Sequence, residues 1–207
     1  WIVDIDLQSF FDEVNQDKLI GIIRRTIKDG NLVSLIRKFL QSGVMEKGVV
    51  QETKKGTPQG GNLSPLLSNI MLNELDKELE SRGLHFVRYA DDCLIMVKSE
   101  KAANRVMESI TTFITKKLGL KVNVEKSKIA RPDNIKYLGF GFYKKINQNI
   151  WRPKPHIKSI NKFKIKLRGI LVRSKSISLD ERLLKLKQII YGWVNYFRIA
   201  DMKMLLL

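Results

Sequence analysis

Two short apolar runs separated by adjacent aspartates constrain the fold of this chain more than any other feature. The runs occupy residues 85–97, and Ala90, Asp91 and Asp92 divide them. This pattern predicts an antiparallel hairpin that carries both carboxylates at its turn. Adjacent carboxylates repel each other, so such a turn costs stability unless a cation neutralises it. An isolated Asp-Asp pair is usually a solvated turn, and the rest of the chain must decide between the two interpretations.

The remaining apolar periodicity predicts a mixed α+β region that is followed by two helices. Residues 1–7 alternate apolar side chains with Asp4 and Asp6, as a half-buried strand does. A capping box at residues 178–181 opens the last helix. The other predicted elements are helices at 18–28, 31–41, 66–79 and 102–118, a strand pair at 44–52, strands at 120–124 and 135–143, and a first basic helix from about residue 160. We place the domain boundary near Ile150.

The positive charge of the chain is concentrated in its second half. Residues 1–100 contain 13 Lys and Arg against 15 Asp and Glu, whereas residues 101–207 contain 25 against 6. This asymmetry indicates a polyanionic partner, and nucleic acid is favoured because bound phosphates release their counterions. A solvated basic face is the ordinary alternative. A membrane surface is disfavoured, because the basic stretch lacks a large aromatic-rich apolar face.

The cysteine and histidine content limits the chemistry further. A single cysteine, Cys93, excludes a disulfide framework, and two histidines add little to any Cys/His metal site. No apolar run reaches the roughly 18 residues that a membrane span needs. We therefore expect a cytoplasmic protein without a membrane partner.

The carboxylates of the first half favour magnesium. Asp6 ends the first predicted strand, and Asp91 and Asp92 occupy the hairpin turn. Hard oxygen ligands suit Mg²⁺, which keeps waters and shares phosphate oxygens with its substrate. Carboxylates from two neighbouring strands would hold two ions about 4 Å apart, the geometry of in-line phosphoryl displacement. A strand-edge acid beside a lysine is the alternative for Asp4 or Asp6 alone.

Five ordered motifs resemble those of reverse transcriptases. Residues 4–12, 56–65, 89–92 and 118–128 are similar to the first four palm motifs, and residues 137–140 to the primer grip. The residues in these motifs are most similar to those of reverse transcriptases encoded by bacterial group II introns, and residues 151–197 resemble the maturase-specific thumb. The resemblance implies an α+β right-hand palm over 1–150, with an antiparallel sheet packed on helices, and a basic helical thumb over 151–207. The fingers would be largely absent.

The resemblance also assigns roles to residues of the palm. Asp6, Asp91 and Asp92 are implied as the catalytic carboxylates that bind two Mg²⁺, which leaves a structural role for Asp4. Phe11 is implied as the aromatic beneath the sugar that excludes a 2′-hydroxyl, with Phe10 as the alternative. The implied nucleotide pocket adds Pro58, Gln59, Gly60 and Lys126, and the implied primer grip is Tyr137, Leu138, Gly139 and Phe140.

In the thumb, the resemblance implies that basic side chains follow a nucleic-acid backbone. Contacts of this kind fix position and carry little sequence information. Trp193, Tyr196 and Phe197 recur at helical spacing and are interpreted as core rather than as base-stacking residues. The implied contact residues are Lys158, Lys162, Lys164, Lys166, Arg168, Arg173, Lys175, Lys185 and Lys187.

The implied activity is that of a bacterial RNA-directed DNA polymerase of a group II intron, which also binds intron RNA for splicing and retromobility. Its partners would be an RNA template, a DNA or RNA primer, intron RNA and deoxynucleoside triphosphates. Because Trp1 begins too late for the fingers, we expect the activity in the parent protein rather than in this chain alone, and a homodimer through exposed palm surface. The alternatives are an RNA-binding splicing maturase without polymerase activity, and a reverse transcriptase of a retron, diversity-generating or CRISPR-associated lineage.

Overall fold

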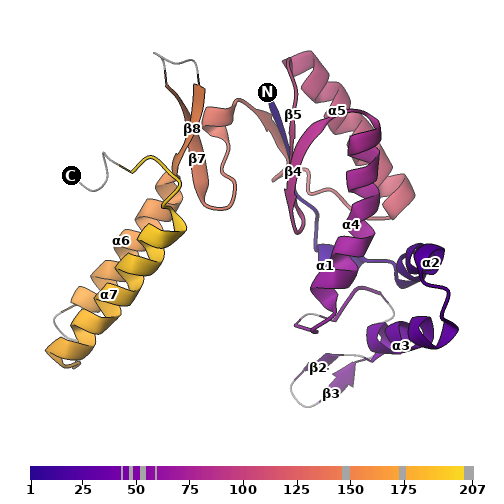
Figure 1. Cartoon of the computed structure of the whole chain (residues 1–207), viewed down its shortest axis with the longest axis horizontal. Helices are drawn as coiled ribbons and strands as arrows, with labels where there is room; N and C mark the ends of the chain where they lie inside the picture. Colours follow the sequence, from indigo (N-terminus) through magenta and orange to yellow (C-terminus); the bar gives the residue numbers. More distant parts are fainter. Residues whose placement is uncertain are drawn as a thin grey trace. The chain divides into compact units, whose positions relative to one another are not determined.

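A computed structural model describes residues 1–42, 44–46, 49–51, 55–58, 60–145, 150–172 and 176–202. The chain divides into two compact units, Trp1–Ile129 and Ala130–Leu207, which Figure 1 colours along the sequence. The division lies earlier in the chain than the boundary expected near Ile150. Within the described ranges, none of the helices combines the length and the apolar character that crossing a membrane requires.

The first unit is built on a four-stranded sheet with the order β4-β5-β1-β6. The strands are β1 (Ile2–Ile5), β4 (His85–Tyr89), β5 (Asp92–Met96) and β6 (Lys128–Ala130). β5 is antiparallel to both β1 and β4, with Ile5 opposite Cys93 and Tyr89 opposite Asp92. This register confirms the predicted hairpin. It also brings the end of β1 and the β4–β5 turn to the same edge of the sheet.

Helices cover this sheet and enclose one apolar core. The fully buried members of this core include Val3 and Ile95 from the sheet and Leu19, Met71 and Ile110 from the helices. Asp29 and Ser99 cap two of the helices through their side chains. The elements are α1 (Phe10–Glu13), α2 (Gln16–Thr26), α3 (Gly30–Gln41), α4 (Ser64–Ser81), α5 (Glu100–Phe113), a π-helical turn (Ile114–Leu118), and the separate pair β2 (Val44–Glu46) and β3 (Val49–Gln51).

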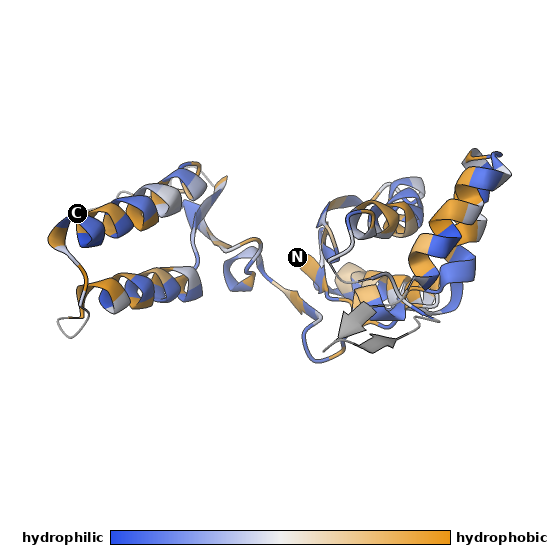
Figure 2. Cartoon of the chain, turned by 90° about the horizontal axis from the view of Figure 1, so that it is seen from below, coloured by the Kyte–Doolittle hydropathy of each residue, from blue (hydrophilic) through white to orange (hydrophobic). Residues whose placement is uncertain are grey.

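The second unit combines a two-stranded antiparallel sheet with two long helices. The strands are β7 (Phe140–Lys145) and β8 (Ile150–Pro155), a 3₁₀ turn (Pro132–Asn134) precedes them, and the helices are α6 (Ile157–Leu171) and α7 (Leu179–Tyr196). Ser178 accepts a hydrogen bond from the Glu181 amide, as the capping pattern predicted. Figure 2 shows hydrophilic and hydrophobic residues alternating along both helices, as expected for helices with one packed face.

Two predicted strands differ from the structure. Residues 120–124 contribute only one isolated bridge, between Leu7 and Val122. The strand expected from residue 135 begins at Phe140, because Leu138 and Gly139 have φ values of 48° and 84° and turn the chain. An apolar stretch does not reveal such a turn, because leucine rarely adopts a positive φ.

Candidate functional site

Three aspartates meet at one edge of the main sheet. Asp4 lies in β1, Asp6 follows the end of that strand, and Asp92 begins β5. Burial raises the pKa of Asp4 to about 6; Lys128 opposes the rise, and the carboxylates of Asp92 and Asp6 add to it. Asp4 therefore interacts electrostatically with each of the other two carboxylates. Gathered negative charge of this kind favours a bound cation.

The structure places Asp6 and Asp92 at the same edge of the sheet but does not group the three predicted metal-binding residues as a ligand set. Asp91 is half-buried in the turn next to Asp92. Within the described part of the chain, no three His, Cys, Asp or Glu side chains are grouped as metal ligands. The donors nevertheless fit Mg²⁺ in kind, because they are carboxylate oxygens that solvent partly reaches. The magnesium site stays a prediction.

The segment after the π-helical turn holds Asp6 in place. The Asp6 amide donates to Ser127 Oγ at 3.0 Å, and the Asn123 amide donates to the Asp6 carbonyl at 2.9 Å. Asn123 Oδ1 accepts from the amides of Glu125 and Lys126, which forms an Asx turn. Lys126 Nζ then lies 3.8 Å from Asp6 Oδ1. The sequence analysis predicted a role for Lys126 but not for Asn123 or Ser127. The available signal was the tendency of Asn and Ser side chains to accept hydrogen bonds from backbone amides.

The turn that carries Asp91 and Asp92 is strained and braced from outside. Ala90 has a φ of 54°, which residues with a Cβ atom rarely adopt. Arg88 Nη1 donates to the Ala90 carbonyl at 2.8 Å, and Arg88 Nε donates to Asp76 of α4 at 2.7 Å. Sequence reasoning missed Arg88 and Asp76, because a pair twelve residues apart has no local signature.

Cys93 lies beneath this turn. It is opposite Arg88 in the β4–β5 register and is almost completely buried. Burial raises the pKa of its thiol to about 12; Asp76 adds to the rise and Arg88 opposes it. The thiol is therefore protonated and shielded at neutral pH.

The predicted nucleotide pocket is fastened to the backbone beside Phe11. Phe10 is buried and Phe11 half-buried, so one of the two aromatics packs in the core, as expected. The Thr57 amide donates to the Phe11 carbonyl at 2.7 Å. Gly56 has a φ of 86°, and a Cβ atom there would lie 2.7 Å from the same carbonyl oxygen. Only glycine permits this approach.

Two polar side chains fix the loop that contains Pro58 and Gly60. Gln16 is buried, and its Nε2 donates to the carbonyls of Leu40 at 3.0 Å and Gly56 at 3.1 Å. Ser64 Oγ donates to the Pro58 carbonyl at 2.5 Å. Pro58 is buried and Gly60 is exposed, and Gln59 lies outside the described residues. Gln16 was not predicted, because a glutamine at a helix start looks like a surface residue.

In the second unit, the predicted primer grip is a tight turn rather than a strand. Tyr137 and Phe140 exchange two backbone hydrogen bonds of 2.9 and 2.8 Å across Leu138 and Gly139. Ser159 of α6 donates to the Gly139 carbonyl at 2.8 Å. Tyr196 of α7 donates to the Leu138 carbonyl at 2.7 Å. Both helices therefore hold the turn.

Aromatic side chains join the same elements. The ring of Trp193 stacks on Phe163 with 4.6 Å between centroids and also contacts Phe197, which in turn contacts Phe140. Phe197 is buried, as predicted for a core residue, whereas Tyr196 is 56% exposed. The indole N–H of Trp193 is buried and has no hydrogen-bond partner among the described residues.

A groove of about 650 Å³ runs over this cluster and has a basic rim. Lys158, Lys162 and Lys166 of α6 line it together with Lys136, while Lys164 and Arg168 are not among its lining residues. On α7, Lys185 pairs with Glu181, and Lys187 lies over the ring of Tyr191. Arg173 and Lys175 lie outside the described residues. The predicted contact residues thus occupy more than one face.

Comparison with known protein families identifies both regions of the chain. Residues 1–142 match the model described as "Reverse transcriptase (RNA-dependent DNA polymerase)". Residues 160–206 match the model described as "Group II intron, maturase-specific domain". The first match covers more than half of the chain.

Curated relatives are longer than this chain. Protein YkfC of Escherichia coli is 31% identical over 70% of the chain and 47% of its own length. The group II intron-encoded protein LtrA of Lactococcus lactis is 30% identical over 68% of the chain and 34% of its length. The retron Ec86 reverse transcriptase of Escherichia coli is 31% identical over 64% and 39%. The chain spans less than half the length of each.

Solved telomerase structures share the fold. The apo telomerase from Candida tropicalis aligns with a TM-score of 0.63 at 15% identity, over 91% of this chain and 35% of the other. The telomerase from Candida albicans, in complex with a fragment of telomeric RNA, aligns with a TM-score of 0.59 at 16% identity, over 95% and 39%. At these identities the likeness extends to the fold alone.

Proposed function

The chain belongs to the reverse transcriptase (RNA-dependent DNA polymerase) family, and from this premise we propose that it forms the palm and thumb of an RNA-directed DNA polymerase encoded by a group II intron. The observation that carries the proposal is the acidic edge of the sheet. Asp6 directly follows β1, and Asp92 is the first residue of the neighbouring strand β5. The maturase-specific match over residues 160–206 supports the intron origin.

At the acidic edge, Asp6, Asp91 and Asp92 would hold two Mg²⁺ ions. When bound, Mg²⁺ supplies charge neutralisation for a primer 3′-hydroxyl and a leaving pyrophosphate. The repulsion of Asp4 by Asp6 and by Asp92 supports this assignment, because it disfavours leaving the carboxylates without a cation. Catalysis would otherwise consist of positioning.

The deoxynucleoside triphosphate would lie between Phe11 and the loop of Pro58, Gln59 and Gly60. Phe11 would exclude a 2′-hydroxyl by contact with the sugar. The hydrogen bond from Thr57 to the Phe11 carbonyl supports this, because it fixes the distance between the loop and the aromatic ring. Lys126 would approach the triphosphate, which its 3.8 Å distance from Asp6 supports.

The RNA template and its primer would follow the groove of the second unit. Lys158, Lys162 and Lys166 would bind phosphates, and the turn at residues 137–140 would position the primer end. The same basic face would bind intron RNA during splicing and retromobility.

Primer extension on an RNA template with Mg²⁺ and deoxynucleotides tests the proposal, using the protein with its natural termini. We expect extension by the unmodified protein and none by the Asp91→Ala, Asp92→Ala variant. Asp17→Ala is the matched control, because its carboxylate pairs with Arg37 on the surface. Extension by all three proteins would refute the metal-site assignment.

A second candidate function is RNA binding in splicing without polymerase activity. The maturase-specific match favours it, because that match covers the basic helices and none of the acidic edge. Failure of all proteins to extend a primer, with RNA binding intact, would select this function. The same match weighs against a retron-type lineage, although a retron enzyme is among the relatives.

The expected homodimer would be excluded by a monomer mass in light scattering.

A further inference from the structure

We propose that Arg88 is a positioning residue, whose guanidinium holds the turn carrying Asp91 and Asp92 in place while Asp76 and Asn69 of α4 hold the guanidinium. The catalytic consequence rests on the proposed function, whereas the brace itself does not. Through Arg88, the helix α4 would determine where the two carboxylates stand.

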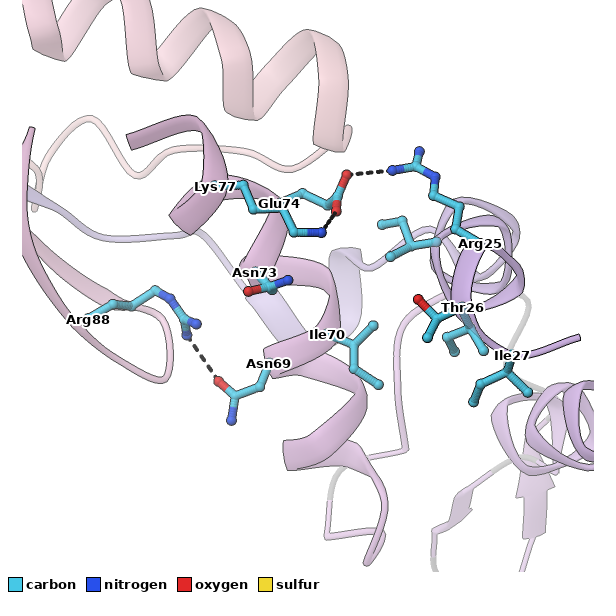
Figure 3. Close-up of a pocket in the computed structure, with 11 residues that line it drawn as sticks. Arg25, Thr26, Ile27, Asn69, Ile70, Asn73, Glu74, Lys77 and Arg88 are labelled. Carbon is cyan, nitrogen blue, oxygen red and sulfur yellow. Dashed lines mark hydrogen bonds and ion pairs between the residues drawn. The ribbon is translucent and has the colours of Figure 1, made fainter. Parts of the chain in front are cut away.

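All three nitrogens of the Arg88 guanidinium donate hydrogen bonds. Nε and Nη2 donate to the two carboxylate oxygens of Asp76 at 2.7 and 2.5 Å. Nη1 donates to Asn69 Oδ1 at 3.0 Å and to the Ala90 carbonyl at 2.8 Å. Figure 3 shows Arg88 pointing toward Asn69, beside a pocket of about 470 Å³. A two-pronged pair of this kind has a defined direction as well as strength.

The Arg88–Asp76 pair is largely shielded from solvent, whereas Asn69 and Ala90 are exposed. The side chain of Arg88 is 11% exposed and that of Asp76 is 19% exposed. Asp76 and Asn69 are seven residues apart on α4, two helical turns, so they present their oxygens from the same face. The guanidinium therefore has few alternative positions, and the carbonyl that it binds is fixed with it.

The turn itself needs an external constraint. Tyr89 and Asp92 are the last paired residues of the hairpin, so only Ala90 and Asp91 form the connection. Connections of two residues usually place glycine or asparagine where φ is positive. Ala90 occupies such a position with a φ of 54°. A strained residue persists where its surroundings hold it, and Arg88 is the side chain that holds the Ala90 carbonyl.

A second arginine pairs with a carboxylate of α4 without touching the turn, although two of its nitrogens donate to one oxygen of Glu78 and the pair is more exposed. Arg82, which follows α4, donates to Glu78 through Nε at 2.8 Å and through Nη2, and to Ser109 through Nη1 at 2.9 Å. Lysine cannot reproduce a two-pronged contact at either site. Arg82→Lys therefore removes another arginine–carboxylate pair of α4 and leaves the turn unaffected.

The test compares Arg88→Lys, Asp76→Asn and Arg82→Lys in the full chain. Amide hydrogen exchange is measured at residues 89–93 and in the β1–β5 ladder, and Mn²⁺ affinity is measured by electron paramagnetic resonance. We expect at least tenfold faster exchange at the turn, with a smaller change in the ladder, for the first two variants. We expect about 10- to 100-fold weaker Mn²⁺ binding, the usual effect of losing a residue that orients a ligand. Arg82→Lys should change neither.

Additivity gives a further requirement. If Arg88 and Asp76 act as one unit, the double variant should lose no more Mn²⁺ affinity than either single variant. Unchanged exchange at the turn in Arg88→Lys would overturn the proposal. Equal acceleration at the turn and in the ladder would also overturn it, because Arg88 would then stabilise the fold in general.

Two further measurements keep the result interpretable. If Arg88→Lys does not fold, as judged by circular dichroism, Asn69→Ala removes one contact only and should accelerate exchange at the turn to a smaller extent; no acceleration would refute the brace. If the unmodified chain binds no Mn²⁺ and the protein with its natural termini extends no primer, the proposed function fails. The exchange data still decide whether Arg88 holds the turn.

Discussion

At the scale of single residues, Asp4 is a carboxylate whose negative charge is disfavoured by burial and by neighbouring carboxylates. Its pKa is raised from 3.8 to about 6, by burial first and then by Asp92 and Asp6, against Lys128. Between these values the folded chain keeps a proton that the unfolded chain releases. Stability is therefore greatest below the lower value and decreases as pH rises through 6.

We expect Asp4→Asn to remove this decrease. Without divalent metal, the difference in unfolding free energy between the variant and the unmodified chain should increase by about 1–2 kcal/mol, in favour of the variant, from pH 4 to pH 8. This is less than the full pKa shift implies, because Asp4 is only partly buried. Urea unfolding at several pH values measures it. Asp17→Asn, on the exposed surface, should show no such gain. A parallel pH profile for Asp4→Asn and the unmodified chain would contradict the assignment.

Gln16 is the residue on which the loop beside Phe11 depends. Gln16→Leu keeps the volume but leaves the carbonyls of Leu40 and Gly56 without their donor. Such a loss costs about 1–3 kcal/mol, measurable by urea unfolding. Gln41→Leu, at the exposed end of α3, should cost much less. Equal effects of the two substitutions would show that Gln16 does not fix the loop.

Candidate site residues were recognisable in the sequence only where they belong to a motif. Asp6, Asp91 and Asp92 stand out through their motifs, and the structure brings Asp6 and Asp92 to one edge of the sheet. Arg88 and Gln16 were invisible, since their partners lie 12 residues away for Asp76 and 24 and 40 residues away for Leu40 and Gly56. Contacts that form only after folding have no local pattern.

At the scale of elements, the turn at residues 137–140 depends on Gly139. A Cβ atom there would lie 3.2 Å from Ser159 Oγ and 3.4 Å from the Phe197 ring, at a φ of 84°. Gly139→Ala should therefore destabilise the chain by about 1–3 kcal/mol. Gly169→Ala, in α6 with nothing within 4 Å of its Cβ, should instead stabilise it by up to about 1 kcal/mol. Thermal unfolding separates the two; stabilisation by both substitutions would rule out strain at Gly139.

Elements were predictable where periodicity is strong and ends are marked. The helices α2 to α7 and the β4–β5 hairpin follow from apolar spacing, and the capping box at Ser178 marks the start of α7. The strands β6 and β8 were not predicted. Three residues are too few to show a period in β6, and Pro153 within β8 argued against a strand.

At the scale of the whole molecule, the separation of charge predicts salt-dependent RNA binding. Lys158→Gln with Lys162→Gln removes two cations from the groove, whereas Lys164→Gln with Arg168→Gln removes two from elsewhere on α6. If each groove lysine binds one phosphate, the first pair should reduce the slope of log affinity against log salt by about 1.4–1.8. Fluorescence anisotropy with a structured RNA measures both slopes. Equal slopes for the two pairs would show that the groove is not the binding face.

The boundary near Ile150 was predicted from a change in composition, whereas the two compact units divide the chain by its contacts. The change from mixed to basic composition marks the helices, whereas the division lies after Ile129. The reason is that the strand predicted at 135–143 was assigned to the palm, yet β7 pairs with β8, and the turn before β7 is bound to α6 and α7 through Gly139 and Leu138. Composition reports surface charge, and pairing decides which strands belong together.

The buried thiol beneath the turn has a practical consequence. Cys93 is the one cysteine in the sequence, and it is shielded while the hairpin is closed. A thiol-specific reagent can modify the folded chain only when the turn region opens. The rate of alkylation, followed by mass spectrometry without any introduced label, therefore reports how often this hairpin opens in the unmodified protein.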